Sequence, residues 1–123
     1  MRKLYIAGPM RGYEHFNFKA FDRAACDLEE AGFIDISPAD LDRLHEGWDT
    51  EPPEDLEVSY DLKVRCMRRD LSVLLDMKPW EGDGIYLLEG WKNSSGAMAE
   101  LALANFLGLS IFEQGGEDDP AKK

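Results

Sequence analysis

The stretch that decides the fold spans residues 84–104 and reads Gly84-Ile85-Tyr86-Leu87-Leu88-Glu89-Gly90-Trp91-Lys92-Asn93-Ser94-Ser95-Gly96-Ala97-Met98-Ala99-Glu100-Leu101-Ala102-Leu103-Ala104. Its first five residues form a short apolar run that predicts a strand, and the small apolar residues that follow predict a helix over 95–106. A strand, a glycine-bearing loop and a helix in this order are typical of parallel α/β proteins. The predicted helix carries one acid, Glu100. Because this acid belongs to no surface charge pattern, we expect the helix to direct it at a bound molecule.

The start of this helix predicts an anion site. Ser94 or Ser95 can cap the helix, which leaves free backbone N–H groups of the first turn facing outward. Gly96 leaves room for a ligand, and Glu100 lies four residues later on the same face, about 6 Å along the axis. One molecule could therefore reach both. The alternative is that Ser95 is only a cap and Glu100 only a solvated or ion-paired side chain.

The rest of the chain alternates strands with helices. Apolar runs predict strands at 4–7, 33–36 and 109–112, and helical spacing predicts helices at 18–31, capped by Asn17, and at 61–76. Residues 39–60 are acidic, and their two prolines predict an irregular segment outside the core. The alternation predicts an α/β three-layer sandwich with a short parallel sheet of order 2-1-3-4, flavodoxin/Rossmann-like, with helices on both faces. We expect one domain over 1–113 and a flexible acidic tail over 114–123.

The composition of the chain excludes several classes of binding partner and cofactor. The chain has 123 residues, of which 44% are hydrophobic, and its 25 acids against 14 bases give a net charge of -11, which argues against binding duplex nucleic acid. No run reaches the length of a membrane span and the start lacks a signal-peptide pattern, so we expect a cytoplasmic protein that does not use a membrane. Cys26 and Cys66 have no metal-ligand spacing, so we expect reduced thiols, no metal and no cofactor.

Two loops far apart in the sequence should meet. In a sheet of order 2-1-3-4, ligands bind at the carboxyl ends of the strands, where the chain reverses between the first and third strands. The loops there are Gly8 to Gly12 and Glu89 to Gly96, so we expect Arg11 to lie near Ser95 and Glu100. The alternative is that the first loop is only a tight turn and Arg11 an ordinary surface residue. The patterns GxGxxG and GxxxxGK[ST] are absent, which removes the dinucleotide fingerprint and the phosphate loop of common ATPases.

The motifs together resemble a known superfamily. They are Tyr5-Ile6-Ala7-Gly8-Pro9-Met10-Arg11-Gly12, Arg69-Asp70, Asp83, and Ser95-Gly96-Ala97-Met98-Ala99-Glu100. This set is similar to the nucleoside 2-deoxyribosyltransferase superfamily. Within it, the run Leu87-Leu88-Glu89-Gly90-Trp91-Lys92-Asn93-Ser94 most resembles the small phage and bacterial proteins of the DUF4406 domain. The resemblance covers about residues 3 to 112.

The resemblance implies a function and a role for each matching residue. It implies a nucleoside or nucleoside 5'-monophosphate N-glycosidase, or a 2-deoxyribosyltransferase, that works as a homodimer or larger homo-oligomer. Glu100 aligns with the glutamate nucleophile, and Asp70 with an aspartate that orients the sugar or protonates the departing base. The implied substrate-binding residues are Gly8, Pro9, Met10, Arg11, Gly12, Asn93, Ser95 and Gly96. Arg11 and Ser95 resemble the residues that bind the 5' end in the monophosphate branch.

Cleavage of an N-glycosidic bond requires one ionised carboxylate and a source of a proton. We expect Glu100, near a helix amino end, to stay ionised and Asp70 to hold a proton if it is buried beside Glu100. The alternative is that Asp70 is only a structural ion-pair partner of Arg11, Arg68 or Arg69.

Two segments depart from the resemblance, residues 41–57 and the join 77–82, and we expect both near the base pocket. Trp48 or Trp91 could stack on a base there, or could only pack a loop onto the domain. Two other classes of function remain open. One is a non-catalytic nucleotide-binding module that senses or sequesters a nucleotide, and the other is a partner-binding protein that uses the acidic segment 39–60.

Overall fold

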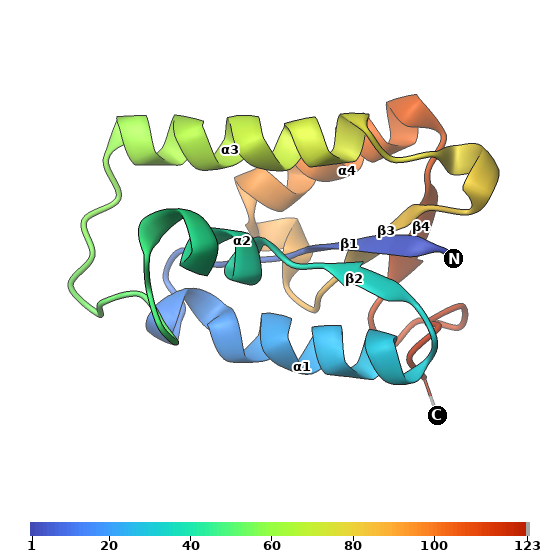
Figure 1. Cartoon of the computed structure of the whole chain (residues 1–123), viewed down its shortest axis with the longest axis horizontal. Helices are drawn as coiled ribbons and strands as arrows, with labels where there is room; N and C mark the ends of the chain where they lie inside the picture. The colour runs from blue at the N-terminus through green and yellow to red at the C-terminus, as the bar shows by residue number, and fades with distance from the viewer. Residues whose placement is uncertain (123) are drawn as a thin grey trace.

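The protein folds around one parallel sheet of four strands (Figure 1). The structure is a computed structural model and describes residues 1–122. The strands are β1 Lys3–Ala7, β2 Ile34–Ile36, β3 Gly84–Leu87 and β4 Ser110–Glu113, in the order β2-β1-β3-β4. All three neighbouring pairs are parallel. The predicted fold class and strand order are therefore confirmed, and each predicted strand boundary agrees to within one residue.

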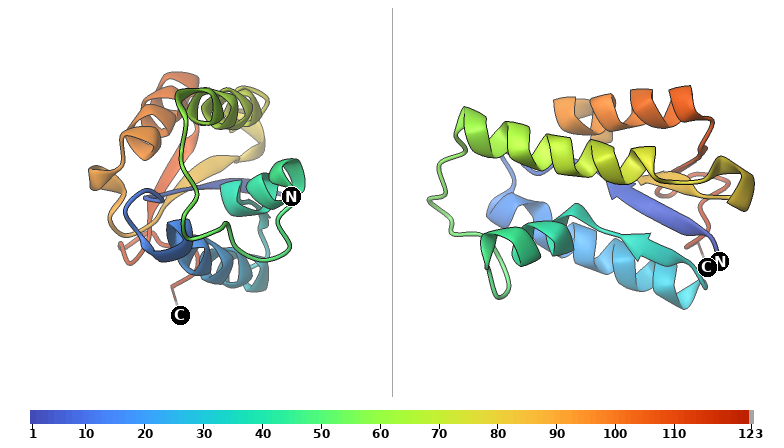
Figure 2. Two further views of the ribbon diagram at one scale, coloured as in Figure 1. Left: turned by 90° about the vertical axis from the view of Figure 1, so that its left-hand side faces the viewer. Right: turned by 45° about the horizontal axis from the view of Figure 1, so that its top comes forward.

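Helices cover both faces of this sheet. The helices are α1 Phe18–Glu30, α2 Pro38–Glu46, α3 Tyr60–Leu75 and α4 Ser95–Leu107, with short 3-10 turns η1 Glu14–Asn17, η2 Pro79–Glu81 and η3 Trp91–Asn93. α1 lies on one face, and α3 and α4 lie side by side on the other (Figures 1 and 2). Within residues 1–122, no helix is both long and apolar enough to span a bilayer.

The alternation of side chains along β1 determines what faces each helical layer. Leu4 and Ile6 pack against α1, whereas Tyr5 and Ala7 pack on the opposite side with residues of α3 and α4. All four side chains are fully buried. Since successive residues of a strand point to opposite faces, the β1 sequence places the hydroxyl of Tyr5 on the α3/α4 side.

The prediction that residues 39–60 are irregular was wrong for their first part. α2 begins with Pro38, whose fixed φ suits the first helical position, and it ends at Gly47, which adopts a left-handed φ of 78°. Ala39 and Asp42 of this helix are buried. The apolar face is so short that it gives little helical periodicity within a stretch dominated by charge, which is why the helix escaped prediction.

Asn17 does not make the capping hydrogen bond that the sequence predicts for α1. It lies at the predicted N-cap position, but it is left-handed. Its side-chain amide instead donates to Pro9 O at 2.8 Å and so fastens the Gly8–Gly12 loop. In the segment after β4, Asp119 accepts hydrogen bonds from the hydroxyl of Tyr86 and from two backbone N–H groups. Lys123 lies outside the described residues.

Candidate functional site

A cavity of about 280 Å³ opens at the carboxyl ends of β1 and β3. The chain from α2 to α3 crosses between the two helical layers at this end of the molecule (Figures 1 and 2). Nine of the ten predicted site residues line the cavity: Gly8, Pro9, Met10, Arg11, Asp70, Asn93, Ser95, Gly96 and Glu100. Gly12 does not line it; this residue is exposed and has a left-handed φ of 80°. The structure therefore brings the two predicted loops together.

The Gly8–Gly12 loop packs closely against the end of β3. A Cβ atom at Gly8 would lie 2.7 Å from the Cβ of Leu88, so only glycine allows this approach. Arg11 is exposed on the rim, and within residues 1–122 its guanidinium makes no hydrogen bond or ion pair. A free cation at the mouth of a cavity in an acidic protein suits an anionic ligand.

The beginning of α4 distinguishes the roles of its two serines. Ser94 is the cap, because its Oγ accepts a hydrogen bond from the Ala97 N–H at 3.1 Å. Ser95 is the first helical residue and is exposed at the cavity, so it is not a cap. The hydroxyl of Ser95 and the amino end of the helix therefore face the same space.

Glu100 is buried beneath the cavity, with 5% of its surface exposed. The hydroxyl of Tyr5 donates a short hydrogen bond to Glu100 Oε2. Burial, with a smaller effect from the charge of Asp70, raises the pKa of Glu100 to about 8, although the Tyr5 hydrogen bond opposes the shift. Glu100 is thus neither solvated nor ion-paired, and its pKa favours the protonated form at neutral pH.

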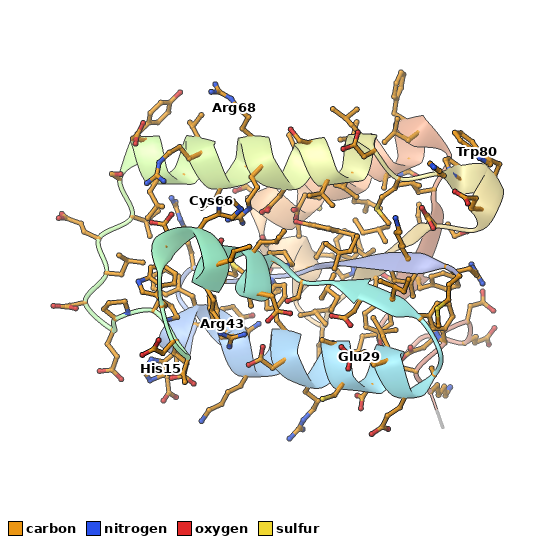
Figure 3. The ribbon with its side chains drawn as sticks, viewed as in Figure 1. His15, Glu29, Arg43, Cys66, Arg68 and Trp80 are labelled. Carbon is orange, nitrogen blue, oxygen red and sulfur yellow. The ribbon has the colours of Figure 1, made fainter. Side chains whose placement is uncertain are left out.

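Asp70 lies across the cavity on α3 and forms an ion pair with Arg69. Arg69 Nε and Nη2 both donate to Asp70 Oδ1, at 2.9 and 2.7 Å, and Nη2 also donates to Asp42 Oδ1 at 2.6 Å. Burial raises the pKa of Asp70 to about 6, with Arg69 acting in the opposite direction. The partner is Arg69, since Arg68 is exposed and points away from the sheet (Figure 3).

The expected protonation states of the two acids were therefore the wrong way round. Glu100, with a pKa of about 8, holds a proton more readily than Asp70, with a pKa of about 6. Glu100 lies in the second turn of α4 and is almost fully buried, so desolvation outweighs the helix dipole, whose effect falls off within the first turn.

The two segments that depart from the resemblance lie at opposite ends of the sheet. Trp48 and Asp42, from the 41–57 segment, line the cavity as expected. The join 77–82 does not, because it leads into the amino end of β3, and Trp80 within it lies at the far end of the molecule (Figure 3). The expectation that this join borders the pocket was wrong.

The tryptophans that could have stacked on a base both make packing contacts. The Trp48 ring packs on Phe18 with centroids 6.3 Å apart, and it still lines the cavity. Trp91 lies outside the cavity lining and donates from its indole N–H to Glu113 at 3.0 Å. Trp48 alone of the two is therefore positioned to meet a ligand.

One cluster could hold a metal ion. Ligand atoms of Glu14, His15 and Glu54 lie within 4.8 Å of one another, and His15 also lies 3.2 Å from Glu51. None of these residues lines the cavity, and His15 sits at the edge of the molecule beside the 51–54 segment (Figure 3). The contacts of His15 with the glutamates are ion pairs only when its imidazole is protonated.

Sequence reasoning missed two side chains that complete the site, Tyr5 and Asp42. The alternation of β1 could have predicted the face of Tyr5, once the position of α4 was known. Asp42 gave no signal, because the helix that carries it was not predicted.

Comparison with known families identifies the family of the chain. The model of a family described as a domain of unknown function, DUF4406, matches residues 2–113. The search of curated proteins found no match.

Proposed function

The chain belongs to the DUF4406 family, and from the chemistry of its cavity we propose that it cleaves the N-glycosidic bond of a nucleoside or nucleoside 5'-monophosphate. The observation that carries this proposal is the presence of two buried acids, Glu100 and Asp70, in one cavity with the exposed cation Arg11 at its mouth. An oxocarbenium-like transition state needs a carboxylate beside the anomeric carbon. Membership in the wider nucleoside 2-deoxyribosyltransferase superfamily is part of this proposal.

Glu100 is the proposed nucleophile. Tyr5 holds Oε2, so Oε1 is the oxygen that attacks. Oε1 forms a bond to the anomeric carbon as the carbon–nitrogen bond breaks, and the electron pair leaves with the base, which takes up a proton. Water then hydrolyses the sugar ester in a glycosidase, whereas a second base displaces the sugar in a transferase. Attack requires ionised Glu100, and positive charge developing on the sugar favours that form.

A 5'-phosphate would meet Arg11, Ser95 and the amino end of α4. These groups line the same cavity, and phosphate is an anion that suits both a helix amino end and an arginine. Lys63 adds a second cation to the lining. We therefore favour nucleoside 5'-monophosphates as substrates and hydrolysis over transfer, with no metal and no organic cofactor.

The proposal is tested by trapping the sugar ester. Protein incubated with a 2'-fluorinated nucleotide should gain the mass of the sugar phosphate on Glu100, as peptide mass spectrometry would show. Glu100→Gln should lose the adduct and the release of free base from deoxynucleoside monophosphates. Glu89→Gln removes an exposed acid outside the cavity lining and should keep both. Unchanged turnover by Glu100→Gln would rule out this mechanism, and a preference for nucleosides over monophosphates would contradict the phosphate site.

A second candidate is a nucleotide-binding module without catalysis. It is favoured by the raised pKa of Glu100, since a protonated carboxyl is not a nucleophile, and by the ion pair that occupies Asp70. Calorimetry separates the two functions. Tight binding of a deoxynucleoside monophosphate, with no base released over days, would select the binding module.

We also propose that the chain assembles as a homodimer or a larger homo-oligomer. α3 and α4 expose large apolar side chains, Tyr60, Leu75, Met98 and Phe106, which a second copy could cover. Sedimentation should show a dimer or larger species, and a monomer at working concentration would contradict it.

A further inference from the structure

Arg69 joins two acids that come from different helices. Its Nη2 atom lies 2.6 Å from Asp42 Oδ1 on α2 and 2.7 Å from Asp70 Oδ1 on its own helix. All three side chains are largely buried, with exposed fractions of 15% for Arg69, 12% for Asp42 and 11% for Asp70. Buried charges in contact are strongly coupled, so removing one changes the state of the others.

Arg69 constrains how Asp70 meets the cavity. Both donating nitrogens bind the same oxygen, Oδ1, so the guanidinium leaves Oδ2 to other partners. Asp42 accepts from the same guanidinium and fixes it from the other side. The Tyr5 hydroxyl is a further hydrogen-bond partner of Asp70. Because an ionised carboxylate has about four acceptor sites, Asp70 keeps acceptor capacity for a ligand.

The titratable side chains around Asp70 come from one strand and three helices. Tyr5 of β1, Asp42 of α2, Cys66 and Arg69 of α3, and Glu100 of α4 all interact electrostatically within this group. Cys66 extends from α3 toward α2 (Figure 3), where its Sγ lies 3.8 Å from Asp42 Oδ1.

Arg69 is the only permanent cation of this group; Arg11 and Lys63 lie elsewhere in the cavity lining, and both are exposed. Burial raises the pKa of the Cys66 thiol to about 11 and that of Tyr5 well above its ordinary value, so both stay neutral. Glu100 is mostly protonated at neutral pH. The negative charge of the group therefore falls on the two acids that touch Arg69.

We propose that Arg69 holds Asp70 as an ionised hydrogen-bond acceptor, that Asp42 fixes the guanidinium of Arg69, and that both are positioning residues, so that Asp70 orients a hydroxyl of the ligand's sugar and does not protonate the base. That the ligand is a nucleoside or nucleotide rests on the proposed function. The two residues act on the ligand only through Asp70. The departing base then takes its proton from water.

The test titrates Asp70 in the ligand-free protein and needs no turnover. The carboxyl of Asp70 is followed by carbon-13 NMR and assigned with Asp70→Asn. Arg69→Gln removes the cation and should raise the midpoint of the Asp70 titration, which reports its pKa, by about one pH unit or more. Asp42→Asn keeps an acceptor for Arg69 but removes the like charge, so it should lower the midpoint. A general loosening of the fold would expose Asp70 in both variants and shift its midpoint in one direction, so opposite shifts distinguish the effect of the two charges from a loss of structure.

Arg43 offers a matched control, because it lies between α1 and α2 (Figure 3), where it also joins two acids, Asp22 and Asp40. It does not line the cavity. Arg43→Gln should leave the midpoint of Asp70 unchanged. If Arg69→Gln does not fold, Arg69→Lys should give a smaller upward shift. An unmoved midpoint in both Arg69 variants, or shifts of the same sign in the Arg69 and Asp42 variants, would overturn the proposal.

Steady-state kinetics test whether Arg69 affects the reaction of a bound nucleotide. With 2'-deoxyadenosine 5'-monophosphate as the probe, Arg69→Lys should raise KM and lower kcat, with the loss growing below the Asp70 midpoint. If no turnover occurs while the NMR shifts appear as expected, the proposed reaction fails but the positioning of Asp70 stands.

Discussion

The hydroxyl of Tyr5 on β1 donates a hydrogen bond to the carboxyl of Glu100 on α4, across 95 residues of sequence. Both side chains are buried, Tyr5 completely and Glu100 with 5% exposure. This bond lowers the pKa of Glu100 against the larger effect of burial. The strand thus provides a donor that stabilises the ionised form that nucleophilic attack requires.

Removing that donor should impair Glu100 as a nucleophile. In Tyr5→Phe, the pKa of Glu100 should rise beyond about 8, since a bond to the ionised form is lost. A hydrogen bond to a charged group contributes about 1.5–3 kcal/mol, so kcat/KM at pH 7 should fall about 10- to 100-fold and partly recover at higher pH. The pH profile of base release and the carbon-13 titration of Glu100 are the measurements.

Tyr86→Phe is the matched control for this prediction. Tyr86 is also a buried strand tyrosine, but its side chain packs on the α1 side and its hydroxyl donates to Asp119. Removal of the Tyr86 hydroxyl should leave the pKa of Glu100 unchanged. Equal effects in the two variants would show that Tyr5 acts through general stability alone.

Glu100 should also make the stability of the fold depend on pH. Its folded pKa of about 8 lies above the ordinary value of 4.5, so the folded protein keeps a proton that the unfolded chain releases between these values. The stabilisation is therefore complete below pH 4.5 and is lost as the pH rises to about 8. Glu100→Gln removes this dependence and should gain on the order of 3 kcal/mol relative to the wild type between pH 5 and pH 8.

Thermal unfolding followed by circular dichroism at pH 5 and pH 8 measures this gain. The exposed acid Glu57 provides the control, because Glu57→Gln should change the melting temperature equally at both pH values. A Glu100→Gln variant whose difference from the wild type is the same at pH 5 and pH 8 would show that the carboxyl titrates normally.

Arg11 should determine the preference for a 5'-phosphate. Because Arg11 is an exposed cation on the cavity rim, Arg11→Gln should weaken binding of a deoxynucleoside monophosphate about 10- to 100-fold and leave binding of the parent nucleoside unchanged. Calorimetry with both ligands gives the comparison. Arg23→Gln removes the same charge from the exposed face of α1 and should change neither affinity. Equal losses for the two ligands would place the phosphate elsewhere.

The sequence predicted the strands and three of the helices for a plain physical reason. Short apolar runs bounded by glycine or proline have few other structures open to them, and 2-1-3-4 is a common order for alternating strands and helices. That order then brought the loops at Gly8–Gly12 and Glu89–Gly96 together without any contact information. The meeting of Arg11, Ser95 and Glu100 at one cavity follows from topology.

The sequence did not predict the helix α2, which is rich in charged residues, or how deeply the side chain of Glu100 is buried. α2 was missed because acidic residues obscure its short apolar face, and Asp42 was missed with it. The protonation of Glu100 was reversed because the sequence shows a helix dipole but not how completely a side chain is buried. Arg69 was one of three arginines considered as partners of Asp70, and the structure selects it because its guanidinium donates to both Asp42 of α2 and Asp70.

Two substrates that differ in whether the departing base needs a proton can show whether Asp70 donates one. If Asp70 is held as an acceptor by Arg69, Asp70→Asn should slow two substrates equally, 2'-deoxyguanosine 5'-monophosphate and its 7-methyl derivative, whose base is already cationic and needs no proton to depart. If Asp70 were the acid, the variant would lose about 10²-fold or more on the first substrate and little on the second. Single-turnover release of each base, compared between variant and wild type, gives the two ratios. A loss confined to the unmethylated nucleotide would assign Asp70 the role of general acid, and would mean that burial, which favours the proton, prevails over the ion pair with Arg69 once a substrate fills the cavity.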